Sequence, residues 1–363
     1  MNANLAGEFK DTGSMLEPRY FHCAVTTELG VLVIAGSGGI ELYNSLSQEW
    51  SARAVLPVAR HTCGAVILRP GVVLVAGGSD AGNALRDAQL YDVAADCWRA
   101  ASPLHTPRFG HTTTLLESGR VLVVGGNNLG PSGGQVQDSV ELYDPLGDLW
   151  HRQGWLPVDA MNHTATLLPD ANLLVVGGFS GRQNAALANA FIYDVASGQW
   201  APVRPMPMPL MQHTATLLLD GRVLVAGGAN EPFGPAQNHA CIYDPAADSW
   251  ELSEMCVPRK DHTATRLAAG QVLVVGASDI SNPENARTAE LYDPLSGQWV
   301  LTAQMPHGRF GHSASCLPTG EVLVAGGARP ISHPAPVSGA EIYTLARVSH
   351  QGASTWAGVK PSR

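Results

Sequence analysis

One phrase recurs along this chain at a spacing of roughly 50 residues. FGHTTTLLESGRVLVVGGNN, from Phe109 to Asn128, returns as MQHTATLLLDGRVLVAGGAN, from Met211 to Asn230. Every copy continues with an apolar run and a tyrosine, and six copies carry a tryptophan seven positions after that tyrosine. Such a period indicates repeated supersecondary units that bury their faces by stacking on one another. The histidines predicted to open the copies are His22, His61, His111, His163, His213, His262 and His312.

A single copy has the pattern of short antiparallel strands. HTATLLLDGRVLVAGG contains two strand-like runs joined at Asp-Gly, a strong local signal for a hairpin. Thr, Val, Leu and Tyr fill the runs, Gly, Pro, Asp and Asn separate them, and no helical period is sustained. One four-stranded unit cannot bury both faces, so we expect seven units to close into a ring. The repeated Tyr and Trp side chains are predicted to pack between neighbouring units.

The period, the paired glycines and the fixed Tyr and Trp positions resemble the kelch repeat, which forms one blade of a β-propeller. The resemblance spans roughly residues 9 to 345 and implies an all-β, seven-bladed β-propeller of four-stranded antiparallel blades. The seventh copy lacks its tryptophan, but Phe9 stands where a tryptophan would precede His22. We therefore predict that residues 7–14 complete the last blade. Residues 1–347 are expected to form a single propeller domain and residues 348–363 a loosely held tail.

Composition narrows the classes of function. The formal net charge of −9 argues against general nucleic-acid binding. MNANLAGEFKDTG is not a cationic, apolar leader, and no apolar run approaches the roughly 18 residues of a membrane span, so we expect a cytoplasmic protein with no membrane partner. The cysteines occupy differing repeat positions without a CxxC motif and are interpreted as buried, reduced thiols. They are Cys23, Cys63, Cys97, Cys241, Cys256 and Cys316.

Recognition is expected on one face of the ring. Alternating strand directions place the loops between second and third strands on the same face as the connections between blades. These loops are long and dissimilar in six copies, and variable loops on a rigid scaffold are the usual place for binding. In the first copy, GSGGIELY leaves almost no loop, which would open a side entrance.

Differences between the copies indicate where a ligand would bind. Arginine stands three residues before the histidine in four copies, in a PRxxH-like phrase whose arginine often faces the central pocket in kelch domains. A basic arc favours an anionic group in the ligand, and methionine-rich neighbours would hold an apolar body. The alternative is that the arginines brace adjacent loops through Asp or backbone carbonyls. The predicted ligand-binding residues are Arg19, Tyr20, Arg60, Arg108, Phe109, Trp155, Met161, Met211, Arg259, Arg309 and Phe310.

The repeated histidines raise the question of a metal, because histidine is the commonest metal ligand. A residue present in every copy is better explained as a hydrogen-bonding element between blades. HTATLLLDGRVLVAGG also resembles the central propeller of galactose oxidase, in whose family one copy of this histidine binds copper with a tyrosine directly before it. No copy here has tyrosine at that position. We therefore predict no metal site and no cofactor, and we do not expect copper-radical oxidation.

Two classes of function remain open. We favour a recognition propeller that binds a partner segment or an anionic, partly apolar small molecule around the central channel. The alternative is a small-molecule enzyme of the isomerase, epimerase or cyclase type, because some kelch propellers isomerise sugar acids. For that chemistry Asp261, between Lys260 and His262, is the acid/base candidate, with Lys260 beside it. No motif has the spacing of a known catalytic site, and a fold does not define a function.

Overall fold

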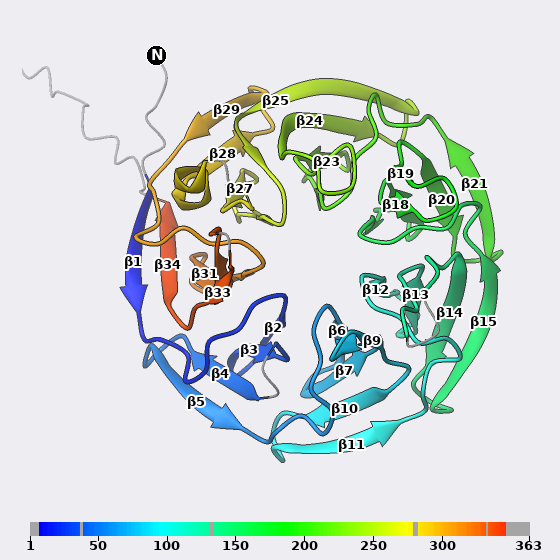
Figure 1. The fold of residues 1–363 in the computed structure, drawn as a ribbon, viewed down its shortest axis with the longest axis horizontal. Helices are drawn as coiled ribbons and strands as arrows, with labels where there is room; N and C mark the ends of the chain where they lie inside the picture. Colours follow the sequence, from blue (N-terminus) through cyan, green and yellow to red (C-terminus); the bar gives the residue numbers. More distant parts are fainter. Residues whose placement is uncertain (1–6, 37–38, 131–133, 279–281, 332, 346–363) are drawn as a thin grey trace, which may run out of the picture.

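The computed structural model describes residues 7–36, 39–130, 134–278, 282–331 and 333–345. Within this part of the chain, seven four-stranded antiparallel sheets surround a central axis (Figure 1). In six of them the strands follow chain order from the axis to the rim. This arrangement confirms the predicted all-β, seven-bladed propeller.

The blades are numbered I to VII in chain order, and the strands of each are given from the axis outward. Blade I contains β2 (Cys23–Thr27), β3 (Gly30–Ile34), β4 (Ile40–Asn44) and β5 (Glu49–Arg53); blade II contains β6 (Gly64–Arg69), β7 (Val72–Ala76), β10 (Ala88–Asp92) and β11 (Cys97–Ala101). Blade III contains β12 (Thr112–Leu115), β13 (Val121–Val124), β14 (Ser139–Asp144) and β15 (Leu149–Trp155); blade IV contains β16 (Thr164–Leu167), β17 (Leu173–Val176), β20 (Ala190–Asp194) and β21 (Gln199–Val203). Blade V contains β22 (Thr214–Leu217), β23 (Val223–Ala226), β24 (Gln237–Asp244) and β25 (Ser249–Arg259); blade VI contains β26 (Thr263–Arg266), β27 (Val272–Val275), β28 (Ala289–Asp293) and β29 (Gln298–Leu301). Blade VII contains β30 (Ser313–Cys316), β31 (Val322–Ala325), β34 (Ala340–Leu345) and β1 (Gly7–Thr12).

The ring is closed by the N-terminal strand, as predicted from the position of Phe9. β1 pairs antiparallel with β34, and Phe9 lies opposite Tyr343 with 5.0 Å between ring centroids. In the other blades a tryptophan occupies this place, as Trp50 does opposite Tyr43 at 5.1 Å. The closure pairs two strand edges that would otherwise be exposed. The predicted tail, 348–363, lies outside the described residues.

The core lies between neighbouring blades. The second strand of every blade is mostly buried, and side chains of adjacent blades form shared clusters, such as Leu122 and Val124 with Leu173 and Val175. Each tryptophan stacks at 4.8–5.1 Å on the tyrosine across its strand pair. The stacked rings place a large apolar area at every junction, so blade packing depends on them.

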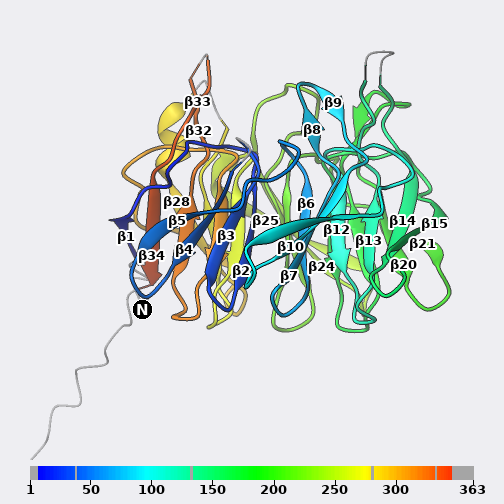
Figure 2. The same ribbon diagram turned by 90° about the horizontal axis from the view of Figure 1, so that it is seen from below.

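The two faces of the disc differ. Two-residue strands extend from one face as small hairpins: β8 (Ser79–Asp80) with β9 (Asn83–Ala84), β18 (Phe179–Ser180) with β19 (Ala185–Ala186), and β32 (Ala328–Arg329) with β33 (Ala335–Pro336). Figure 2 shows β8, β9, β32 and β33 on this face, together with the 3₁₀ turn η1 (Pro283–Arg287). The side entrance expected at blade I falls at residues 37–38, outside the described part of the chain. No helix among the described residues is long and apolar enough to cross a bilayer.

The cysteines differ from the sequence-based expectation of uniform burial. All six are free, but Cys97 and Cys256 are exposed. Both lie on outer strands, β11 and β25, where one face of the strand meets solvent rather than a neighbouring blade.

Candidate functional site

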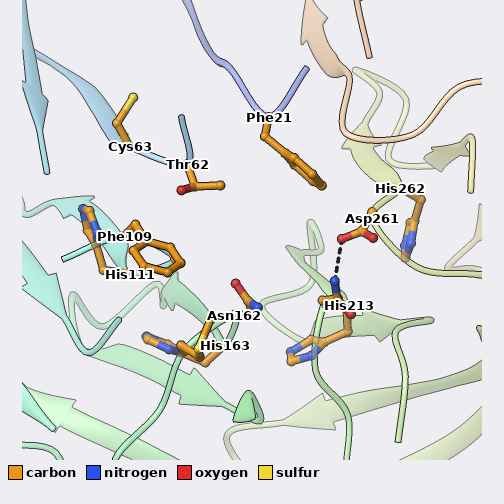
Figure 3. Close-up of a pocket in the computed structure, with 13 residues that line it drawn as sticks. Phe21, Thr62, Cys63, Phe109, His111, Asn162, His163, His213, Asp261 and His262 are labelled. Carbon is orange, nitrogen blue, oxygen red and sulfur yellow. Dashed lines mark hydrogen bonds between the residues drawn. The ribbon is translucent and has the colours of Figure 1, made fainter. Parts of the chain in front are cut away.

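A cavity of about 480 Å³ lies at the axis, where the inner strands begin (Figure 3). We call it the central pocket. Its walls come from the segments that enter the inner strands of blades I to VI. The lining residues are Phe21, Thr62, Cys63, Phe109, Gly110, His111, Met161, Asn162, Gln212, Asp261, and the histidines His163, His213 and His262.

A belt of backbone hydrogen bonds ties these walls together. The residue directly before the histidine position of each blade, which we call a belt residue, has a left-handed backbone with φ between +48° and +61°. In six of them the backbone N–H donates to the carbonyl of the equivalent residue in the preceding blade, as Asn162 N does to Gly110 O at 2.9 Å. Between Gln212 and Asp261 the side chains make the contact, because Gln212 Nε2 donates to Asp261 Oδ1 at 3.0 Å. The belt residues are Phe21, Thr62, Gly110, Asn162, Gln212, Asp261 and Gly311.

The belt gives the pocket two chemically different sides. Asn162, Gln212 and Asp261 form a polar arc, whereas Phe21 and the neighbouring Phe109 and Met161 are apolar. Figure 3 shows Phe21, Asn162 and Asp261 directed toward the middle of the cavity. Within the described part of the chain, the side-chain amide of Asn162 has no hydrogen-bond partner.

The Thr62 hydroxyl has no hydrogen-bond partner among the described residues, but its oxygen is buried in the wall and is not open to the cavity. The acidic group of the polar arc is Asp261. Burial raises the pKa of the Asp261 carboxyl to about 6, against the opposing effects of Lys260 and Gln212. Asp261 therefore changes charge close to neutral pH, as an acid/base group must. Lys260 is held away, since its Nζ donates to Gly234 O at 2.7 Å.

The repeated histidines link neighbouring blades. Nε2 of His262 shares a hydrogen bond with Thr214 Oγ1 at 3.0 Å, and four other junctions have an equivalent Thr–His or Ser–His contact. Burial lowers the pKa of His262 to about 3, so the ring is neutral. The first glycine of the diglycine pair packs on the ring, and a Cβ on Gly227 would lie 2.7 Å from His262 Cε1. The histidines therefore stabilise blade contacts, as the repeat suggested.

The second copy of the repeat needs a different register from the one inferred from the sequence. Arg60 Nη1 donates to Gly77 O as Arg108 Nη1 donates to Gly125 O, so the two arginines are equivalent. Cys63, rather than His61, consequently occupies the histidine position. His61 follows His22 by only 39 residues because it lies two positions before Cys63, the true equivalent of the repeat histidine.

The five predicted arginines do not face the pocket, which corrects the expectation of a basic arc. Each is at most 1% exposed, and its guanidinium lies within its own blade. Arg108, for example, donates to Glu141 Oε1 at 2.6 Å and to Gly125 O at 2.7 Å. With their donors directed to protein oxygens and no exposed surface, these arginines cannot hold an anionic ligand, and the loop-bracing alternative describes them. The pairs are Arg19–Glu41, Arg60–Asp87, Arg108–Glu141, Arg259–Glu290 and Arg309–Glu341.

In blades I, III and VI the carboxylate of the ion pair also accepts backbone N–H groups of the loop that enters the blade. Glu141 accepts the N–H groups of His105 at 2.7 Å and Thr106 at 3.1 Å. In blade VII the equivalent of His105 is Pro306, which has no N–H, and Glu341 Oε2 is buried without a partner. Burial accordingly raises the pKa of Glu341.

Blades IV and V have no such ion pair. Ala160 and Phe191 replace the arginine and the carboxylate in blade IV, and Leu210 and Cys241 replace them in blade V. Each of these apolar pairs is buried.

The remaining predicted residues are divided between the pocket, its surroundings and the outer surface. Phe109, Met161 and Asp261 line the pocket. Tyr20 and Phe310 lie behind it, with ring centroids 5.3 Å and 6.0 Å from Phe21. The two others are not at the pocket: Trp155 is 67% exposed at the end of β15, and Met211 packs in a cluster with Phe179, Ala186 and Ala229.

Sequence reasoning missed four pocket residues: Phe21, Thr62, Asn162 and Gln212. The signal was present, because each directly precedes the histidine position and these residues differ from copy to copy. Variation at one register position of a repeat is what a binding site formed at the axis requires.

Closed blades around a ligand-sized axial cavity define a seven-bladed β-propeller with a central pocket. The chain belongs to the kelch-repeat family: residues 110–327 match the family model described as the KLHDC2/KLHL20/DRC7 Kelch-repeats domain, and residues 59–105 match the Kelch motif. No curated protein matches the chain significantly. The kelch fold indicates a role in binding or recognition.

Two solved structures share the fold. One is a fungal alcohol oxidase of the AA5 family in complex with copper, with 17% identity, a TM-score of 0.73, and coverage of 94% of this chain and 76% of the oxidase. The other is YjhT, with 15% identity, a TM-score of 0.62, and coverage of 79% of this chain and 95% of YjhT. The likeness to the AA5 oxidase agrees with the galactose oxidase resemblance seen in the repeat.

The central pocket does not fit a copper centre of the kind that the oxidase fold suggests. No group of three or more His, Cys, Asp or Glu side chains among the described residues is arranged to hold a metal ion. Five of the repeat histidines have Nε2 engaged between blades, as His213 Nε2 is with Thr164 Oγ1 at 3.0 Å.

Proposed function

We propose that this kelch propeller is a recognition protein that binds a small polyhydroxylated molecule in the central pocket. The observation that carries the proposal is the convergence of three polar groups with unused bonding capacity on one cavity. They are the side-chain amides of Asn162 and Gln212 and the Asp261 carboxyl, each from a different blade. Buried polar groups normally have partners, and a ligand with several hydroxyl groups would supply them.

The shape and polarity of the pocket support this class of ligand. A volume of about 480 Å³ falls in the range of small-molecule sites, roughly 300–1,000 Å³. Phe21 and Phe109 offer aromatic surface to the C–H face of a ring, while Asp261 and the amides accept and donate hydrogen bonds on the other side. Because the arginines are sequestered in ion pairs, the ligand has no need of an anionic group, and the carboxylate of Asp261 disfavours one.

Binding is tested by thermal shift against neutral monosaccharides, linear polyols, sugar acids and short peptides. A ligand of the native state raises the unfolding temperature. We expect stabilisation by neutral polyhydroxylated compounds and none by sugar acids. Stabilisation by peptides alone would favour recognition of a partner segment and contradict the proposal.

Variants locate the site by calorimetry with the compound that stabilises most. Asp261→Asn and Asn162→Ala should each weaken binding by about 1.5–3 kcal/mol, or roughly tenfold to a hundredfold. Asp80→Asn changes an exposed carboxylate on β8, away from the pocket, and should leave affinity unchanged. Equal affinity of Asp261→Asn and the native protein would exclude this site.

The enzyme alternative has one observation in its favour, the pKa of about 6 at Asp261. A carboxyl group that titrates near neutral pH is suited to general acid/base catalysis, such as epimerisation or isomerisation. If the bound compound is turned over, the rate should follow ionisation of a group with pKa near 6 and should be lost in Asp261→Asn. Binding without turnover, followed by NMR, would leave recognition as the function.

A further inference from the structure

The junction between blades I and II differs from every other junction of the ring. Five junctions have a hydroxyl of one inner strand bonded to the histidine of the next blade. The junction between blades II and III keeps its histidine, but Gly64 stands at the hydroxyl position and His111 Nε2 has no partner among the described residues. Cys23 occupies the hydroxyl position in blade I, since it lies opposite Ile34 as Thr112 lies opposite Val124. Cys63 occupies the histidine position in blade II. Two thiols therefore replace the polar contact.

A third substitution accompanies the two cysteines. The first glycine of the diglycine pair is replaced in blade I by Ala35, which keeps the left-handed φ of +73°. At other junctions a Cβ there would collide with the histidine ring, as at Gly227 with His262. Because the Cys63 side chain is smaller than imidazole, Ala35 is accommodated, and both lie in the same buried cluster. The junction is thus a coherent alternative to the Thr–His contact, built around two sulfur atoms.

The two thiols are already in contact. The Sγ atoms of Cys23 and Cys63 are 3.2 Å apart, and Cys23 Sγ also donates to Cys63 O at 2.7 Å. A disulfide bond has sulfur atoms about 2.05 Å apart, so closure requires a movement of about 1 Å. Cys63 lines the central pocket, which gives a small oxidant a path to its sulfur.

We propose that Cys23 and Cys63 are a redox-active pair, which a peroxide converts into a reversible disulfide joining blades I and II. This site is independent of the ligand proposed for the pocket.

Cys63 is the attacking residue and Cys23 the resolving residue. The contact with Cys23, assisted by the charge of Arg60, lowers the pKa of Cys63, whereas the same contact and burial raise that of Cys23. The thiolate is the nucleophile, so Cys63 reacts first. Its sulfur attacks one oxygen of hydrogen peroxide, the O–O bond breaks, and the leaving hydroxide takes the thiol proton to become water.

The second step forms the bridge. Cys23 sulfur attacks the sulfur of the Cys63 sulfenic acid, and the hydroxyl group leaves as water with the Cys23 proton. In sum, two thiols and one hydrogen peroxide give one disulfide and two waters. The two thiols are oxidised and the peroxide is reduced, and a dithiol reductant reverses the bridge by thiol–disulfide exchange.

The bridge is detectable by peptide mapping of the full chain. Protein reduced with dithiothreitol and desalted is treated with a small excess of hydrogen peroxide, the free thiols are alkylated, and the protein is digested with trypsin. Cleavage after Arg19, Arg53, Arg60 and Arg86, with Arg69 protected by the following Pro70, puts Cys23 on peptide 20–53 and Cys63 on peptide 61–86. We expect the two peptides linked, with two hydrogens lost, and separated again by dithiothreitol.

Two variants make the test specific. Cys97→Ser removes an exposed thiol and should not affect the bridge. The triple variant Cys23→Thr/Cys63→His/Ala35→Gly restores the residues found at the other junctions, and it should fold normally. Peroxide should raise the unfolding temperature of the native protein by several degrees and leave that of the triple variant unchanged. The proposal is overturned if peroxide oxidises Cys97 while peptides 20–53 and 61–86 remain unlinked.

Discussion

The buried ion pair of blade VII, Arg309–Glu341, can be replaced by the apolar pair that blade V has at the same positions, Leu210 and Cys241. Arg309→Leu alone removes the only cation bonded to Glu341 within the described residues and leaves a buried carboxylate. Removing one partner of a buried pair costs about 3–5 kcal/mol of unfolding free energy. Adding Glu341→Cys reproduces Leu210 and Cys241. Both blades have proline at the entering loop, Pro306 and Pro207, so no backbone N–H loses its acceptor. The double variant should lie within about 1 kcal/mol of the native protein.

The double-mutant cycle is measured by urea unfolding followed by tryptophan fluorescence. We expect a coupling energy above about 2 kcal/mol, since independent sites add to within about 0.5 kcal/mol. The matching cycle in blade III, Arg108→Leu with Glu141→Cys, should recover less stability. There the N–H groups of His105 and Thr106 lose their acceptor, at about 1–3 kcal/mol each. Additive costs in blade VII, or equal recovery in both blades, would refute the reasoning.

Three further outcomes are expected. Burial lowers the folded-state pKa of the six repeat histidines, to about 3–4 where it is resolved, so their contribution to the unfolding free energy is complete above the unfolded pKa near 6.5 and is lost as the pH falls. At pH 5 the unfolding free energy is lower by about 2 kcal/mol per histidine, which is enough for acid unfolding near that pH. Circular dichroism would detect this unfolding, and a protein that stays folded at pH 4 would contradict it. Thr214→Val should lower the unfolding free energy by about 1–3 kcal/mol by leaving His262 Nε2 unpaired, whereas Thr344→Val, at a half-buried contact with Glu321, should cost less in the same urea titration. Deleting residues 1–14 should lower the unfolding temperature and expose the edge of β34, and an unchanged melting curve would contradict closure by β1.

The propeller fold could be predicted from the sequence because each blade repeats the same local sequence pattern. The turn after the first strand, the paired glycines and the Tyr–Trp spacing each specify a local feature, and most copies carry each of them. Closure was also predictable, because Phe9 substitutes one aromatic ring for another at the missing tryptophan position. In these cases a residue's role depends on its own blade and the next one, which the repeat displays.

The site was harder to predict, because its residues are defined by what differs between copies. The prediction that the arginines face the pocket was wrong because it did not consider their acidic partners, which the sequence also shows. Blades that carry the arginine also carry an acidic residue two or four positions before the tyrosine, and blades that lack it have Phe191 or Cys241 instead. That correlation identifies an ion pair without coordinates. The depth at which Asp261 and Asn162 lie relative to the axis depends on how seven blades converge, which no single repeat specifies.

The belt separates the construction of the pocket from its chemistry. Six of the seven belt contacts are made by peptide groups, and the contact between Gln212 and Asp261 is made by side chains. At the other positions the side chain is free to change provided that it tolerates a left-handed backbone. The belt therefore presents one side chain per blade around a fixed rim. A new binding preference can be reached by exchanging one or two side chains, and asparagine, aspartate and glycine are the residues most readily exchanged there. Gly110 and Gly311 are not empty positions, because a Cβ there would lie 2.9 Å from Asn162 Oδ1 and 3.0 Å from Phe21 Cε1; a side chain added at either glycine would also move Asn162 or Phe21.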